Sequence, residues 1–225
     1  DPLEGTKFTA NNQPNAFSVI AVADKGNILS APDTYMEKIA IGAHLPKNLL
    51  DIDYGVEKNI KLLAEAKNKK TNELSACVLK RPRHDQIIKT LQEMDVNINY
   101  ITDGDIAGVL SVIGNKPRND IYYSTGGGPE GVLAAAALSF FGGQIQGRLV
   151  LDEEEKIRAK KIGIQDFKKK YNIDDMVKGD VIFCASGVTS GDLAKGVQDL
   201  GNKFQVTTFA LHKSKKINKI ITNIY

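Results

Sequence analysis

The sequence predicts an α/β protein, organised as a layered α/β sandwich of two subdomains with a functional site in the cleft between them. After residue 75, short apolar runs alternate with loops and helical patterns, which is typical of layered α/β folds. Residues 52–69 form an amphipathic pattern in which Val56, Ile60 and Leu63 recur at helical spacing. The composition is 42% hydrophobic and 25% charged over 225 residues, enough to bury a substantial core.

The charge and the cysteines exclude several classes of protein. The net charge is only +3, and lysines cluster at residues 67–70, 168–170 and 213–216. We expect these clusters to be solvated helix ends and a hairpin turn, so no nucleic-acid partner is predicted. No apolar run approaches the length of a membrane span, so no membrane partner is predicted either. Cys77 and Cys184 lie inside apolar runs and should be buried reduced thiols, which fits a cytoplasmic location.

The first part of the chain should contain a hairpin and a separate strand. Residues 16–23 form a mostly apolar run that predicts a strand, residues 24–27 suit a hairpin turn, and residues 28–31 start the expected return strand. A further strand should begin within residues 33–38, with Tyr35 packed at an edge.

The polar stretch 68–72 follows the helix predicted over 52–69 and marks the expected boundary between two subdomains. We place residues 1–75 in the first subdomain and residues 76–225 in the second. The elements expected beyond this boundary are strands at 76–79, 96–101, 120–124 and 180–185, helices at 85–94, 106–113, 132–140 and 152–161, a connector at 168–177, and a closing hairpin of 204–212 and 217–224.

The first six residues, DPLEGT, carry the strongest chemical pattern. Asp1 and Glu4 can converge on one hard cation, for which carboxylate oxygens are the preferred ligands. Gly5 permits a tight turn, and Thr6 can cap a helix whose free N–H groups suit an anion. The pattern predicts metal-assisted phosphate hydrolysis, and the alternative is an ordinary surface turn.

Two arginines flank a proline between an expected strand and the next helix. Arg81, Pro82 and Arg83 therefore lie at a strand end, where α/β proteins bind ligands. Arginine forks match phosphate oxygens, so these residues are candidate phosphate ligands. The alternative is a solvated charge run. His84, which follows, is predicted to be structural or to support the neighbouring ligands rather than to act as a general base.

Two further loops follow strand ends. Asp103, Gly104 and Asp105 form either a simple turn or a site where the carboxylates accept hydrogen bonds from sugar hydroxyls. Residues 125–131 form a glycine-rich turn before an apolar helix. Such a turn exposes N–H groups at a helix N-terminus and suits a phosphate group, although the pattern matches neither a Walker loop nor a dinucleotide fingerprint.

These motifs together resemble one family. DPLEGT resembles the D-P-[LI]-[DE]-G-[ST] signature of the lithium-sensitive sugar and inositol phosphatases, and Glu4 at its fourth place resembles the class II fructose-1,6-bisphosphatases of the GlpX type. Four further blocks resemble the same family: D-x-Y-M-E-K at 33–38, K-P-R-H-D at 81–85 with Arg81 in place of lysine, D-G-D at 103–105, and G-G-x-P-E-G at 126–131.

The resemblance implies a role for each residue of these blocks. Asp1, the Leu3 carbonyl, Glu4 and Glu130 would bind Mn²⁺ or Mg²⁺, and Asp1, Glu4 and Thr6 would be catalytic. The substrate-binding residues that it implies are Glu4, Gly5, Thr6, Tyr35, Arg81, Pro82, Arg83, Asp103, Gly104, Asp105 and Gly127.

The family implies a metal-dependent phosphatase that removes the 1-phosphate of fructose 1,6-bisphosphate in gluconeogenesis. It also implies a fold of the sugar-phosphatase type and a homo-oligomer, dimeric or tetrameric. The alternatives are a related sedoheptulose-bisphosphate or inositol phosphatase, or a sugar-phosphate-binding fragment. The family carries a segment before its first motif with a further Asp and Glu. We therefore expect the first subdomain, a metal-binding unit, to be N-terminally incomplete. A chain starting at Asp1 should bind sugar phosphate and hydrolyse it negligibly.

Overall fold

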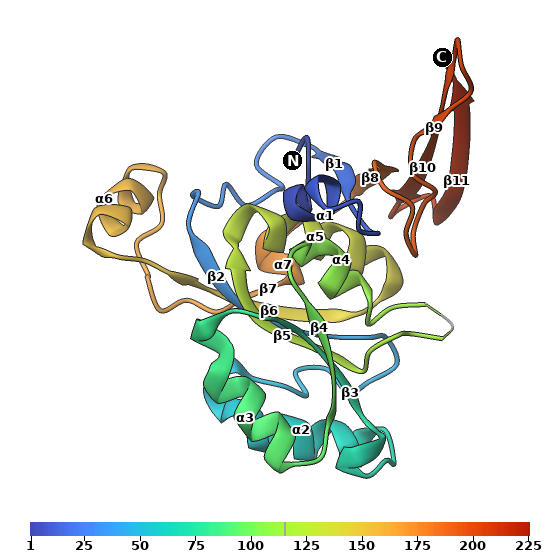
Figure 1. Ribbon diagram of the computed structural model, residues 1–225. Helices are drawn as coiled ribbons and strands as arrows, with labels where there is room; N and C mark the ends of the chain where they lie inside the picture. Colours follow the sequence, from blue (N-terminus) through green and yellow to red (C-terminus); the bar gives the residue numbers. More distant parts are fainter. Residues whose placement is uncertain (115) are drawn as a thin grey trace.

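Two β-sheets with helices between them form the centre of the molecule (Figure 1). The structure is a computed structural model and describes residues 1–114 and 116–225. The first sheet is antiparallel, with strand order β1-β8-β10-β11 and β9 beside β10. Its strands are β1 (Phe17–Ala23), β8 (Val181–Gly187), β9 (Gln198–Asp199), β10 (Phe204–His212) and β11 (Ile217–Ile224).

The second sheet has strand order β4-β3-β5-β2-β6-β7. Its strands are β2 (Tyr35–Ile41), β3 (Ser75–Leu79), β4 (Asn97–Ile101), β5 (Ile121–Gly127), β6 (Gln144–Val150) and β7 (Tyr171–Asn172). The neighbours β4, β3 and β5 are parallel, so their C-terminal ends meet at one edge of the sheet. Three of the loops that the sequence singled out begin at this edge, where ligands of α/β proteins commonly bind.

Helices cover both faces of the second sheet (Figure 1). Between the sheets lie α4 (Asp105–Leu110), α5 (Gly128–Phe141) and α7 (Ile173–Met176), while α2 (Gly55–Ala66) and α3 (Asp85–Glu93) pack on the outer face. The remaining elements are α1 (Thr6–Ala10), α6 (Glu153–Lys161), and 3₁₀ turns at Ile52–Tyr54, Thr71–Glu73 and Pro82–His84.

Two hydrophobic cores result from this layering. The core between the sheets surrounds α5, whose residues 134–138 are all buried. A helix that is apolar on all sides needs partners all round, and the two sheets supply them. The second core lies between the second sheet and α2 and α3, where Ile60 and Leu63 from the predicted amphipathic pattern are fully buried.

The layered α/β prediction is confirmed, with some local errors. The return strand expected at 28–31 is wrong, because β1 pairs with β8 instead and Ile28 makes only an isolated bridge to Val177. The expected connector at 168–177 contains β7 and α7, and β6 was not anticipated. Each sheet combines strands from both sides of the boundary after residue 75, and the division into two subdomains stays a prediction.

Some polar and thiol side chains also differ from expectation. Lys67 and Lys69 were expected to be solvated, but both form ion pairs with the buried Asp120. Lys170 pairs with Asp51. Cys77 is buried as predicted. Cys184 is partly exposed on the outer side of β8. Within the described residues, every helix is too short or too polar to cross a membrane.

Candidate metal and phosphate site

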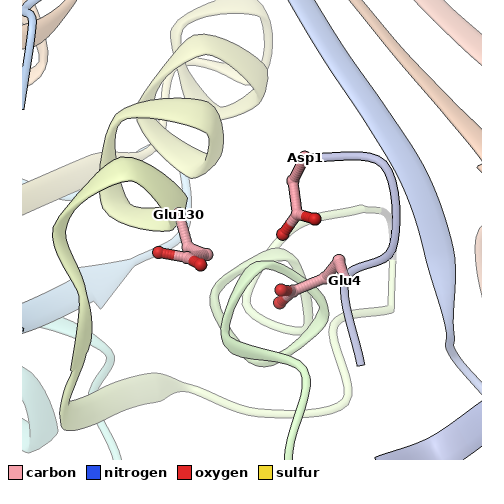
Figure 2. Close-up of side chains that lie close together, drawn as sticks. All are labelled: Asp1, Glu4 and Glu130. Atoms are coloured by element: carbon pink, nitrogen blue, oxygen red, sulfur yellow. The ribbon is translucent and has the colours of Figure 1, made fainter. Parts of the chain in front are cut away.

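Three carboxylates face one another near the start of the chain. Asp1 and Glu4 come from the first segment, and Glu130 comes from the first turn of α5 (Figure 2). One carboxylate oxygen from each residue lies within 4.8 Å of the others. Two opposite ligands of a Mg²⁺ ion are separated by about 4.2 Å, twice the ordinary bond length, so the cluster is close to the dimensions of a cation site.

Backbone pairing with β1 fixes the first segment. The Glu4 amide donates to the Phe17 carbonyl at 2.8 Å, and the Phe17 amide donates back to the Glu4 carbonyl at 3.1 Å. Asp1 is held similarly, because the Val19 amide donates to its carbonyl at 2.8 Å. The chain then turns at Gly5, whose φ of 79° lies in the left-handed region that favours glycine, and α1 begins at Thr6.

The Glu4 carboxylate is buried beside other acidic groups. Its residue is only 5% exposed, and its Oε1 accepts a 2.8 Å hydrogen bond from the Ile106 amide at the start of α4. Burial raises the pKa of Glu4 to about 7, and repulsion from the nearby carboxylates of Asp105 and Glu130 adds to the effect, against the opposing hydrogen bond from Ile106. A divalent cation at this position would stabilise the ionised form.

Glu130 is a second observation that fits a cation site. Among the described residues, its buried Oε2 has no hydrogen-bond partner. Such an orphaned oxygen is costly unless an ion, water or ligand satisfies it. The carboxylate also folds back over the helix start, where a Cβ on Gly127 would lie 2.5 Å from its Cδ. The donor set is entirely oxygen, so it fits the hard cations Mg²⁺ and Mn²⁺.

Arg83 contacts the end of β5, where Gly127 lies three residues before Glu130. Arg83 donates from Nε and Nη2 to the Thr125 carbonyl, at 3.0 and 2.7 Å. Its guanidinium carbon is 4.6 Å from the centre of the Tyr35 ring. Tyr35 is the register partner of Gly127, so the structure brings Arg83, Tyr35 and Gly127 together.

His84 hydrogen-bonds to the end of β5, beside the group of Arg83, Tyr35 and Gly127. Its Nε2 accepts a 2.8 Å hydrogen bond from the Thr125 amide, so its Nδ1 carries the proton and donates to the Leu79 carbonyl at 2.6 Å. The ring is fully buried, and burial lowers its pKa below the ordinary value. The predicted structural role of His84 is confirmed, and the ring ties the end of β3 to the end of β5.

The remaining loops lie around the first segment. The Arg81 guanidinium donates to the Thr102 carbonyl at 2.6 Å, and Pro82 begins the 3₁₀ turn. The Asp103 carboxylate accepts a 2.9 Å hydrogen bond from the Lys7 amide in α1. Gly104 packs so closely on Phe8 that any Cβ at its position would collide with that ring. The loop at 103–105 therefore borders α1, whose first residue is the exposed Thr6.

Asp105 turns inward rather than toward solvent. It is 7% exposed, and its two carboxylate oxygens are bonded to Lys38 and to the Tyr122 hydroxyl. Contacts with sugar hydroxyls, and a metal contact from the Leu3 carbonyl, stay predictions. The sequence analysis gave Lys38 no role. Its signal was the inward face of β2, where a lysine stands between Met36 and Ala40 in an otherwise apolar alternation.

Known proteins resemble the chain over its whole length. The family model described as bacterial fructose-1,6-bisphosphatase, glpX-encoded, matches residues 1–225. The class 2 fructose-1,6-bisphosphatase of Haemophilus influenzae is 36% identical over 236 residues, which cover 98% of this chain and 70% of the relative. Fructose-1,6-bisphosphatase 1 class 2 of Escherichia coli K12 is 37% identical with the same coverage.

A cyanobacterial relative carries a broader name. The D-fructose 1,6-bisphosphatase class 2/sedoheptulose 1,7-bisphosphatase of a Synechococcus strain is 34% identical over 239 residues, which cover 100% of this chain and 69% of the relative. Both the motifs and these extended similarities agree with the geometry of the site. The chain belongs to the glpX-encoded family of bacterial fructose-1,6-bisphosphatases.

Proposed function

We propose that this protein is a metal-dependent phosphatase that hydrolyses the 1-phosphate of fructose 1,6-bisphosphate to give fructose 6-phosphate and phosphate. Its family and the names of its relatives support this activity. The observation that carries the proposal is the cluster of Asp1, Glu4 and Glu130. Glu130 lies three residues after Gly127, whose register partner Tyr35 contacts Arg83. Dimeric or tetrameric assembly, a cytoplasmic location and a role in gluconeogenesis are further parts of the proposal.

The carboxylates of Asp1, Glu4 and Glu130, with the Leu3 carbonyl, are the groups that would hold Mn²⁺ or Mg²⁺. When bound, such an ion polarises the phosphoryl group and lowers the pKa of the attacking water. The hydroxyl of Thr6, an exposed residue at the start of α1, would orient that water.

The loops around the cluster would hold the sugar phosphate. Arg83 keeps N–H groups free of its Thr125 bonds for a phosphate, and the first turn of α5 adds backbone donors. Tyr35, Arg81, Asp103 and the neighbouring residues would orient the sugar and its second phosphate. Fixed positioning of this kind can lower the barrier by several kcal/mol, on the order of 7–11 kcal/mol in favourable intramolecular cases.

Phosphate release from a panel of phosphate esters tests the proposal. The natural polypeptide is incubated with Mn²⁺ or Mg²⁺ and fructose 1,6-bisphosphate, sedoheptulose 1,7-bisphosphate or inositol 1-phosphate. We expect turnover of the fructose ester, its loss in EDTA and its return with metal. Turnover of the sedoheptulose ester would extend the set of substrates to the second one that the name of the Synechococcus relative gives.

Two matched variants locate the activity. Glu130→Gln removes one negative charge from the cluster, whereas Glu154→Gln removes the same charge from α6, outside the cluster. We expect a large loss of turnover in the first variant and none in the second. Turnover that persists in EDTA, or in Glu130→Gln at the parental rate, would refute the proposed site.

A further inference from the structure

The most unusual charged group outside the predicted site is Lys38. It lies on β2 with no exposed surface, although lysine is almost never fully buried unless it is paired. Its ammonium contacts the Asp105 carboxylate and donates to the Gly127 carbonyl at 2.6 Å. A buried ammonium is costly, so both contacts must be maintained to keep it in place.

The two partners of Lys38 stand at the starts of two helices. Asp105 is the first residue of α4, and the next amide, that of Ile106, donates to Glu4 Oε1 at 2.8 Å. Gly127 is the N-cap of α5, and Glu130 lies in the first turn of that helix. One ammonium group therefore joins the backbone that holds Glu4 to the backbone that carries Glu130.

Close packing leaves this junction little freedom. A Cβ on Gly126 would lie 2.6 Å from Asp105 Cγ, and a Cβ on Gly131 would lie 3.0 Å from Lys38 Cδ. The Tyr122 hydroxyl donates to the second oxygen of Asp105, so both oxygens of that carboxylate are engaged. A packed interior of this kind resists gradual deformation and transmits a shift at one group to its neighbours.

We propose that Lys38 is a positioning residue, whose ammonium ties the starts of α4 and α5 together and so holds Glu4 and Glu130 at the separation needed to share one divalent cation with Asp1. This inference rests on the metal site of the proposed function. It assigns to Lys38 no contact with substrate. Outer groups that orient metal ligands in this way usually affect metal affinity as well as activity.

Binding of Mn²⁺ alone, without substrate, measures this role directly. The signal of free aqueous Mn²⁺ in electron paramagnetic resonance disappears on binding, so a titration gives the dissociation constant. The main variant is Lys38→Met with Asp105→Asn, which removes both buried charges and leaves neither unpaired. The matched control is Lys67→Met with Asp120→Asn, which removes an ion pair at the opposite end of β5.

We expect the Lys38 double variant to raise the Mn²⁺ dissociation constant by roughly 10- to 100-fold. The control should keep the parental Mn²⁺ dissociation constant, even if its thermal unfolding midpoint falls as much as that of the Lys38 double variant. A folded Lys38 double variant with the parental constant would overturn the inference. Should that variant fail to fold, Lys38→Gln decides, because its shorter side chain cannot reach both partners. Parental affinity in folded Lys38→Gln would equally overturn the inference.

Glu130→Gln separates this inference from the proposed function. If the parent binds Mn²⁺ and Glu130→Gln weakens that binding while both Lys38 variants do not, the metal site stands and the role of Lys38 fails. If the parent binds no Mn²⁺, or Glu130→Gln binds it as the parent does, the metal site fails and the inference falls with it.

Discussion

Two N–H groups of Arg83 donate to one backbone carbonyl, and the guanidinium lies against the Tyr35 ring. These contacts fix the orientation of the side chain before any ligand binds. A guanidinium has five N–H groups in a planar fork, so the others can serve a phosphate. This geometry would preorganise the exposed Arg83 for a phosphate, and its role as a phosphate ligand stays a prediction.

Arg83→Ala should weaken binding of fructose 1,6-bisphosphate and leave Mn²⁺ binding nearly unchanged. Losing one charge-assisted contact typically costs about 1.5–3 kcal/mol. Calorimetric titration of the bisphosphate and of Mn²⁺ measures the two affinities separately. Arg118→Ala is the control, because Arg118 is exposed and pairs only loosely with Asp192 at 3.7 Å. Equal bisphosphate affinity in the two variants would contradict the assignment.

Single residues were predictable where a short motif carried them. Asp1 and Glu4 were named from one motif and Glu130 from another, and the structure places their oxygens together. A role for Lys38 was not predicted, because that role depends on which residues of other elements its side chain contacts. Its ion pair with Asp105 joins residues from two distant motifs, and no local pattern indicates that contact.

At the scale of elements, His84 connects a strand end, a 3₁₀ turn and a second strand end. It belongs to the turn, donates to Leu79 at the end of β3 and accepts from Thr125 in β5. The hydrogen bond from Thr125 requires the neutral ring, since a protonated Nε2 could no longer accept, whereas Nδ1 donates to Leu79 in either state. Protonation of this ring would therefore weaken the link between the ends of β3 and β5, beside which Arg83 lies.

His84 should make a destabilising contribution below neutral pH, opposite in sign to that of Glu4, whose raised pKa favours the folded state as the pH falls. Its pKa is lowered in the folded state by burial, so the unfolded chain binds a proton first, near its ordinary pKa of about 6.5. The contribution is complete above that pH and is lost as the pH falls toward the lower folded value. Urea denaturation of the parent and of His84→Gln from pH 8 to pH 5 should show this loss in the difference between their unfolding free energies, because the contribution of Glu4 is common to both. An unchanged slope in a folded His84→Gln would contradict the prediction.

Elements were predictable where the pattern was local, as for α2, α3 and the hairpin of β10 and β11. The return strand at 28–31 failed because both edges of β1 are occupied, one by β8 and the other by Asp1 and Glu4. Strand β6 was missed because its polar side chains obscure the alternation. Gln146, for example, accepts a 2.8 Å hydrogen bond from the Ile52 amide of a distant turn.

At the scale of the whole molecule, the second sheet separates two hydrophobic cores, and only one of them lies next to the carboxylate cluster. The core around α5 supports the carboxylate cluster, whereas the core beneath α2 and α3 contacts the opposite face of the sheet. The sequence predicted layers but could not say which helix occupies which layer. That choice depends on the pairing of β2 with β5 and β6, partners that lie far from it along the chain.

Leu63→Ala should lower stability without affecting the metal site. Leu63 is fully buried in the outer core, and truncating such a side chain typically costs about 2–5 kcal/mol. Urea denaturation measures the loss, and the Mn²⁺ titration should give the parental dissociation constant under native conditions. A large change in that constant would show that the two cores are coupled more tightly than the layering suggests.

The backbone pairing of Asp1 and Glu4 with β1 also orders events during synthesis. Ribosomes make the N-terminal part of a chain first, so these two carboxylates emerge long before Glu130. The sheet neighbour of β1 is β8, at Val181–Gly187, which is made later still. Until then, the first segment lacks the sheet that fixes it opposite α5. Ion capture should therefore be a late event, completed after most of the polypeptide has left the ribosome, and cannot guide the early steps of folding.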